Sequence, residues 1–227
     1  MIPKTIHYCW FGRGKKPDLV LRCIESWKKH CPDYQIIEWN EDNFELGSNQ
    51  YVKEAYEKKK YAFVSDVARL NALNKFGGFY MDTDVELLKS LDSLLMHNCI
   101  LGFEEKNYIA TSFIGCEPNH QLIEKFLNQY NNISFYNFDR TVNLTTNVKR
   151  LTELLMKQGL IRDGSHQLLP NGITVFPQEY FSPYNYIDFE LKKTNKTICI
   201  HHFYVSWMPW YQRIKKIIKK VTHRIKF

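Results

Sequence analysis

The order of apolar runs and helical patterns along this 227-residue chain predicts an α/β fold. Between residues 5 and 81, short apolar runs alternate with segments whose apolar residues recur at helical spacing. This alternation favours a mostly parallel sheet with right-handed crossovers and helices on its faces. A hydrophobic content of 44% can form a sizeable core. We therefore expect residues 1–207 to form one domain.

The first half of the chain gives the clearest element boundaries. A strand is expected at residues 5–10, because this apolar run ends in a glycine-containing turn. Pro17 suits the first turn of the helix that follows. Gly77 and Gly78 can end a later helix, since glycine adopts left-handed backbone conformations at little steric cost. The same reasoning places strands at residues 34–39 and 79–81 and helices at residues 51–60 and 62–76.

The second half alternates less regularly. Short apolar runs and amphipathic stretches still indicate separate elements there. We expect strands at residues 100–103, 112–115, 173–176 and 197–202, and helices at residues 121–130 and 147–158.

Two carboxylates follow the third strand. Asp82 and Asp84 stand one residue apart, directly after the apolar run of residues 79–81. Ligands of open α/β sheets bind at the carboxyl ends of the strands, and carboxylates there can hold a divalent metal. An Asp-x-Asp pair by itself is weak evidence for a metal site, because many such pairs are solvated loop residues.

The net charge of +7 is concentrated near the C-terminus. Residues 211–227 contain seven Lys and Arg residues and no acidic residue, so the rest of the chain is formally neutral. Apolar residues form one helical stripe in this stretch: Ile214, Ile217, Ile218, Val221 and Ile225. We expect residues 208–227 to form a basic amphipathic helix on an anionic membrane surface. Docking of the stripe onto the domain is the alternative, and little favours nucleic-acid binding.

The six cysteines and the N-terminus point to a reducing compartment. The cysteines show no C-x-x-C pair and no dense spacing, which is typical of free thiols. Residues 1–7 lack the pattern of a signal peptide, and no apolar run approaches the length of a membrane span. We expect a cytoplasmic protein attached peripherally to the inner face of the cell membrane.

Three further positions have both a structural and a functional interpretation. Asp66 and Arg69 share one face of their helix and form either a surface ion pair or contacts to sugar hydroxyls. Trp10, at the end of the first strand, is either a core residue or a stacking platform for a nucleobase. His201 and His202 are either structural residues or partners of a metal or a diphosphate.

Four phrases of the sequence, taken in order, resemble a known enzyme family. They occupy residues 2–12, 37–42, 65–69 and 77–84. Together they resemble family 32 glycosyltransferases, which include bacterial capsule and O-antigen enzymes and the sugar-binding-region proteins with a DXD motif. The chain is also similar to the catalytic domain of large clostridial toxins. One departure is Thr146-Asn147-Val148, where family members often carry Thr-Gly-Pro.

The resemblance implies a GT-A type, Rossmann-like fold and a role for each matching residue. Asp66, Arg69, Asp82 and Asp84 become the catalytic residues. Asp84 ligates Mn²⁺ or Mg²⁺ directly, with Asp82 and His202 as its further ligands. The residues implied to bind the nucleotide-sugar donor are Trp10, Asp66, Arg69, Tyr80, Asp82, His202, Ser206 and Trp207.

The function implied is retaining, metal-dependent transfer of a hexose. The donor would be a nucleotide-sugar, with UDP-sugars favoured, and the acceptor a lipid-linked oligosaccharide of capsule or O-antigen synthesis. A toxin-like enzyme with a protein acceptor is the alternative. A haloacid-dehalogenase-type phosphatase fits less well, because the chain has no later acidic pair of the kind such enzymes need.

Overall fold

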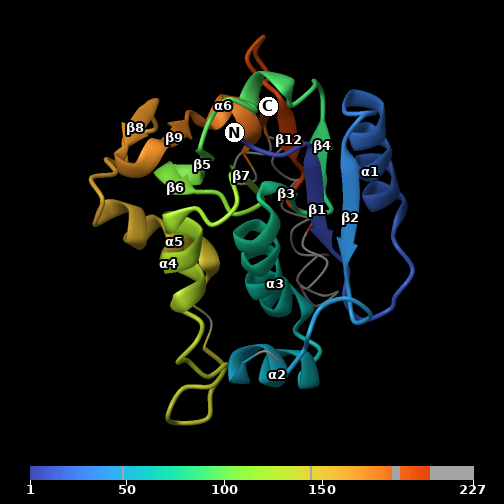
Figure 1. Ribbon diagram of the computed structural model, residues 1–227, viewed down its shortest axis with the longest axis vertical. Helices are drawn as coiled ribbons and strands as arrows, with labels where there is room; N and C mark the ends of the chain where they lie inside the picture. The colour runs from blue at the N-terminus through green and yellow to red at the C-terminus, as the bar shows by residue number, and fades with distance from the viewer. Residues whose placement is uncertain (48, 144, 186–189, 205–227) are drawn as a thin grey trace, which may run out of the picture.

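A computed structural model describes residues 1–47, 49–143, 145–185 and 190–204. Its central sheet has the order β2-β1-β3-β7-β5-β9-β8, and β6 pairs with β5 at one end (Figure 1). The strands of this sheet are β1 (Thr5–Cys9), β2 (Gln35–Trp39), β3 (Gly78–Met81), β5 (Cys99–Glu104), β6 (Tyr108–Ile109), β7 (Phe113–Cys116), β8 (Gln167–Leu169) and β9 (Ile173–Phe176).

Five strands of the central sheet share one direction. β1 is parallel to β2 and β3, and β5 is parallel to β9. β7 is antiparallel to both β3 and β5, so these two neighbours of β7 point the same way. The predicted α/β sheet with mostly parallel strands is confirmed. The carboxyl ends of β2, β1, β3 and β5 consequently meet at one edge of the sheet.

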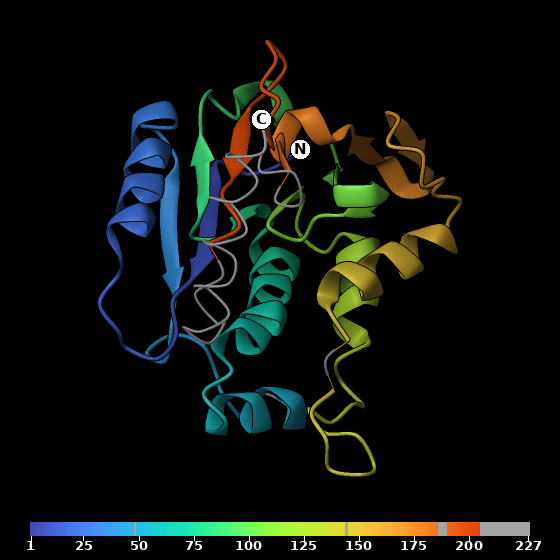
Figure 2. The same cartoon turned by 180° about the vertical axis from the view of Figure 1, so that it is seen from behind.

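Helices cover both faces of the sheet (Figures 1 and 2). One face packs against α2 (Gln50–Glu57), α3 (Tyr61–Phe76), α4 (Gln121–Asn128) and α5 (Asn147–Met156). The opposite face packs against α1 (Asp18–His30), α6 (Gln178–Phe181), β4 (Val85–Leu87) and β12 (Cys199–His201). The small remaining elements are β10 (Tyr184–Asn185), β11 (Glu190–Leu191) and 3₁₀ turns at Asp92–Leu94, Glu105–Asn107 and Pro170–Gly172.

The predicted long elements are confirmed, with one difference in their arrangement. β12 does not join the central sheet; it pairs with β4 in a separate antiparallel ribbon. All six cysteines are free and buried, as expected. Among the described residues, none of the helices has the length and apolarity needed to cross a membrane. The predicted helix at residues 208–227 lies outside the described residues.

The turn between α3 and β3 depends on two glycines. Gly77 caps α3, since its N–H bonds to the carbonyl of Leu73, and its φ of +62° lies in the left-handed region. Gly78 has φ +93°, and a Cβ there would lie 2.6 Å from the carbonyl oxygen of Thr5 on β1. β3 can therefore approach β1 only because residue 78 has no side chain.

We predict that Gly78→Ala destabilises the fold by about 1–3 kcal/mol, because both backbone strain and the clash with β1 act against it. Urea unfolding measures the effect. Gly47→Ala is the matched control, since a Cβ there meets nothing within 4 Å. Equal stability of both variants would refute this account of the turn.

Candidate active site

The candidate active site lies where β2, β1 and β3 end. Ile6 and His7 of β1 pair with Phe79 and Tyr80 of β3, so the residues that follow these two strands are neighbours. This register places Trp10 beside the Asp82–Asp84 segment. The sheet thus brings together motifs that are more than 70 residues apart in the sequence.

A buried guanidinium organises this edge. Arg69 is only 4% exposed and reaches from α3 to the end of β3. Its Nη2 donates to Asp66 Oδ1 at 3.0 Å, and its Nη1 lies 3.3 Å from Asp82 Oδ1. Nη1 also donates to the carbonyl of Thr111 at 2.7 Å. The surface ion pair considered for Asp66 and Arg69 is therefore wrong, because both side chains are buried in one network.

Tyr80 supports the same network from β3. The Arg69 guanidinium lies over the Tyr80 ring, and its Cζ is 4.5 Å from the ring centroid. The Tyr80 hydroxyl donates to Asp82 Oδ1 at 2.8 Å. Cation–π contact and hydrogen bond together hold Asp82 against the α3 side of the sheet edge.

Asn147 joins this network, although the sequence did not single it out as a site residue. Its Nδ2 donates to Asp66 Oδ1 at 2.5 Å, and both residues are buried. Asn147 opens α5, which Thr146 caps by accepting from the N–H of Lys149. One sequence feature could have pointed to Asn147 as a site residue. At residues 146–148 the chain departs from Thr-Gly-Pro, and Asn147 places a hydrogen-bonding side chain where the family often has a glycine.

Burial governs the charge of Asp66. Loss of solvent raises the pKa of its carboxyl to about 7, although Arg69 opposes this rise. Nearby Asp82 adds to the rise by repulsion between like charges. Asp66 can thus exchange a proton near neutral pH, unlike an exposed aspartate.

Asp84 turns to the other side of the edge, toward β12. Its Oδ2 lies 3.5 Å from Nε2 of His201 and accepts the backbone N–H of Tyr204 at 2.6 Å. Burial alone would raise the pKa of Asp84, but His201 and these hydrogen bonds hold it below its ordinary value. Burial likewise opposes a charge on His201, yet Asp84 brings the pKa of this histidine above its ordinary value.

Asp82, Asp84 and His201 form a group that fits a divalent cation. Each offers one ligand atom, and these atoms lie within 4.8 Å of one another. Two carboxylate oxygens and an imidazole nitrogen suit Mn²⁺, and the carboxylates suit Mg²⁺. The residues present therefore fit the metal that the DXD resemblance implies.

His202, the histidine expected to ligate the metal, lies outside this group. His202 directly follows β12, and its Nε2 is 2.8 Å from Glu86 Oε2. The structure brings its neighbour His201 to the two aspartates instead. Ser206 and Trp207, expected to bind the donor, lie outside the described residues.

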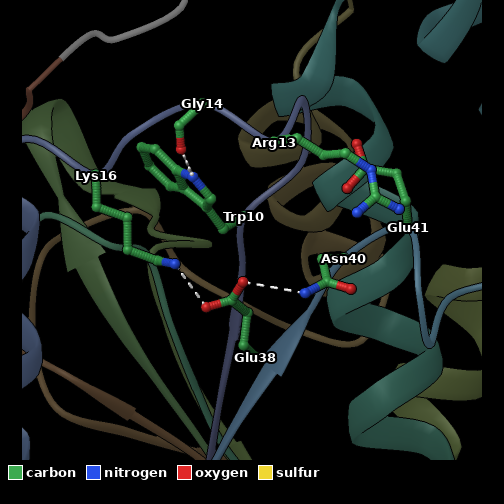
Figure 3. Close-up of a pocket in the computed structure, with 7 residues that line it drawn as sticks. All are labelled: Trp10, Arg13, Gly14, Lys16, Glu38, Asn40 and Glu41. Carbon is green, nitrogen blue, oxygen red and sulfur yellow. Dashed lines mark hydrogen bonds and ion pairs between the residues drawn. The ribbon is translucent and has the colours of Figure 1, made fainter.

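Trp10 lines a pocket formed by residues that follow β1 and by the end of β2 (Figure 3). Its indole N–H donates to the carbonyl of Gly14 at 2.7 Å, and the Lys16 ammonium lies 5.6 Å from its ring centroid. Glu38 accepts from both Lys16 and Asn40. The Trp10 side chain is partly buried and packs against the core, in agreement with the structural interpretation, while stacking on a nucleobase stays a prediction.

A mixed α/β sheet with acidic residues at its carboxyl edge is typical of the GT-A-like class of fold. Comparison with solved structures agrees. "PaToxG Glycosyltransferase" matches with a TM-score of 0.52 at 19% identity, over 69% of this chain and 68% of that one. A glycosyltransferase involved in the glycosylation of the major capsid of PBCV-1 matches with a TM-score of 0.52 at 11% identity, over 95% of this chain and 99% of that one.

Part of the sequence matches a family of glycosyltransferases. Residues 17–101 match the family described as "Glycosyltransferase sugar-binding region containing DXD motif". The matched segment, about a third of the chain, includes Asp66, Arg69, Asp82 and Asp84. The resemblance stated from the sequence is confirmed, and the phosphatase alternative loses its basis.

Curated relatives match about half of the chain at low sequence identity. Human lactosylceramide 4-alpha-galactosyltransferase is 27% identical over 131 residues, which is 56% of this chain and 34% of that protein. Inositol phosphoceramide mannosyltransferase 3 of Schizosaccharomyces pombe is 26% identical over 126 residues, 54% of this chain and 35% of that protein. The match thus spans about a third of the length of these relatives.

The raised pKa of Asp66 predicts a pH-dependent stability difference. Its folded-state pKa of about 7 exceeds the ordinary 3.8, so the folded state keeps a proton that the unfolded chain has lost. The stability of the wild type relative to Asp66→Asn should fall between about pH 4 and pH 7, by up to about 1.4 kcal/mol per pH unit.

Urea unfolding of both proteins across this range measures that difference. Asp18→Asn, which removes an exposed carboxylate, controls for the loss of an acidic group. A difference between wild type and Asp66→Asn that does not change with pH would contradict the assigned environment.

Proposed function

We propose that this protein is a metal-dependent, retaining glycosyltransferase that moves a hexose from a nucleotide-sugar, with UDP-sugars favoured. The observation that carries the proposal is the group of Asp82, Asp84 and His201 beside the buried pair Asp66 and Arg69. This group stands in the segment that matches the DXD family.

Each residue has a role that its geometry supports. Trp10 stacks on the base of the donor at the end of β1, where its pocket is open. Arg69 is held by its backbone and carboxylate partners and stabilises the diphosphate and the donor sugar. Asp66 accepts sugar hydroxyls and offsets the positive charge that develops on the ring. Tyr80 keeps Asp82 in place.

Asp84, Asp82 and His201 hold the cation. When bound, Mn²⁺ or Mg²⁺ supplies a Lewis acid that neutralises the departing diphosphate. His202 then keeps its contact with Glu86, and its expected place among the metal ligands passes to His201. Ser206 and Trp207 close over the diphosphate in this proposal.

Retention is proposed to proceed by attack on the front face of the donor sugar. The acceptor oxygen bonds to the anomeric carbon on the side from which the diphosphate leaves. The bond between the anomeric carbon and the phosphate oxygen breaks, and that phosphate oxygen takes the acceptor's proton. We assign no covalent nucleophile on the protein.

The acceptor is proposed to be a lipid-linked oligosaccharide, as in capsule or O-antigen synthesis. Two observations support a lipid-borne acceptor. The curated relatives are named for glycosyl transfer to lactosylceramide and inositol phosphoceramide. In addition, residues 208–227 have the composition of a basic, amphipathic, membrane-associating helix. Such a helix would hold the enzyme at the inner face of the cell membrane.

A protein acceptor is the competing proposal. It is favoured by the similarity of fold to a glycosyltransferase involved in the glycosylation of the major capsid of PBCV-1. Transfer of radiolabelled sugar separates the two, because the label partitions into organic solvent with a lipid acceptor and precipitates with a protein acceptor.

We predict that Asp84→Asn lowers Mn²⁺-dependent donor hydrolysis on the order of 100-fold or more, because the departing diphosphate loses its charge stabilisation. The assay screens UDP-Gal, UDP-Glc, UDP-GalNAc, UDP-GlcNAc and GDP-Man. The exposed Asp163→Asn is the control and should retain wild-type turnover. Unchanged hydrolysis by Asp84→Asn would overturn the metal assignment.

Deletion of residues 211–227 should release the protein from vesicles that contain phosphatidylserine, since each lost cation removes about 1 kcal/mol of attraction to an anionic surface. Donor hydrolysis should persist, because the proposed donor-site residues precede the deletion. Co-sedimentation measures binding, with neutral phosphatidylcholine vesicles as the control. Equal sedimentation of the full-length and truncated proteins would rule out the anchor.

A further inference from the structure

One carboxylate near the proposed metal group has no assigned role. Glu104 is the last residue of β5 and lies at the same edge of the sheet as Asp82, because β5 and β3 run in the same direction on either side of β7. The Glu104 side chain is partly buried. No hydrogen bond or ion pair of its carboxylate is found within the described part of the chain.

His201 has a buried ring nitrogen without a hydrogen-bond partner among the described residues. Its Nε2 faces Asp84, but its Nδ1 is buried and has no hydrogen-bond partner among the described residues. A buried ring nitrogen without a partner is costly, and native proteins seldom leave one. Within the described part of the chain, only Nε2, the nitrogen that faces the proposed metal group, has a polar partner.

The backbone aims Glu104 and His201 toward the same space. A Cβ on Gly102 would lie 2.5 Å from the ring of Phe181, so this face of β5 points to α6. Cys199 on β12 also points to α6, since its Sγ donates to the carbonyl of Phe181 at 3.4 Å. Glu104 and His201 each stand two residues further along these strands and project to the same sides.

The electrostatics of the two groups agree with this placement. Burial raises the pKa of the Glu104 carboxyl to about 7, and His201 is the first of the neighbours that act on it. Glu104 in turn favours the charged form of His201, after the larger effect of Asp84. The charge of each group therefore shifts the pKa of the other.

We propose that Glu104 is the positioning residue of the metal group, accepting the Nδ1–H of His201 and so leaving Nε2 free to bind the cation. Metal-binding histidines in proteins almost always donate their other ring N–H to a carboxylate, a carbonyl or water. Here the carboxylate comes from β5 and the histidine from β12. The inference rests on the proposed function, because it assumes that Asp82, Asp84 and His201 bind a divalent cation.

The test measures Mn²⁺ binding to the full chain by calorimetry and by electron paramagnetic resonance, without substrate. Glu104→Ala should weaken Mn²⁺ binding by about 10- to 100-fold, the loss typical of removing such a partner. Glu104→Gln should bind more tightly than Glu104→Ala, because the amide oxygen still accepts a hydrogen bond. Glu86→Gln is the matched control, since Glu86 is the partner of the neighbouring His202.

A second readout follows the imidazole itself. With Mg²⁺ bound, ¹⁵N-correlated NMR should show the His201 proton on Nδ1 in the wild type and a mixture of tautomers in Glu104→Ala. Circular dichroism and thermal unfolding confirm that the variants are folded. Wild-type affinity together with a single tautomer in Glu104→Ala would overturn the inference.

The outcomes separate this inference from the proposed function. Failure of the wild type to bind Mn²⁺, or equal binding by Asp84→Asn, would refute the metal-dependent function and the inference with it. Binding that Asp84→Asn abolishes and Glu104→Ala leaves unchanged would refute the role of Glu104 alone. An equal loss in Glu86→Gln would show a general effect of charge and would also count against Glu104.

Discussion

Burial of the Arg69 guanidinium is the constraint on which the site depends. A charge taken out of water is costly unless its donors are satisfied and an opposite charge is near. Ser65 and Thr111 supply carbonyls, while Asp66 and Asp82 supply negative charge. These partners come from α3, from the end of β3 and from the loop before β7, so one side chain fixes three segments relative to each other.

The spacing of the two aspartates explains how one motif serves two sides of the sheet. Asp82 contacts Arg69 and Tyr80 on the side covered by α3. Asp84 instead contacts His201 and Tyr204 on the side covered by β12. The segment turns between them at Thr83, where Val85 donates its N–H back to the carbonyl of Asp82. The pair thus joins the buried Arg69 network to the proposed metal group.

Sequence patterns predicted the fold well wherever they were long. Strands such as β1 and helices such as α3 follow from periodicity, and the glycines before β3 mark its start. Two-residue strands such as β6 and β10 have no period to detect. The pairing of β12 with β4 could not be predicted from the sequence either, because the residue pattern of a 3-residue strand does not specify which strand lies beside it. For the site, residues within motifs were predictable, whereas the choice of His201 over His202 depended on the register of that pairing.

The pairing of β12 with β4 has a consequence for biosynthesis. His201 pairs with Val85, directly after Asp84, so the two halves of the proposed metal group are 117 residues apart in the sequence (201 − 84). Chain entropy opposes such a distant closure until much of the intervening sheet has formed. A ribosome-bound intermediate that ends before β12 would hold the DXD segment yet lack its histidine. Binding of a cation at the proposed group therefore requires that β12 has been synthesised and has paired with β4.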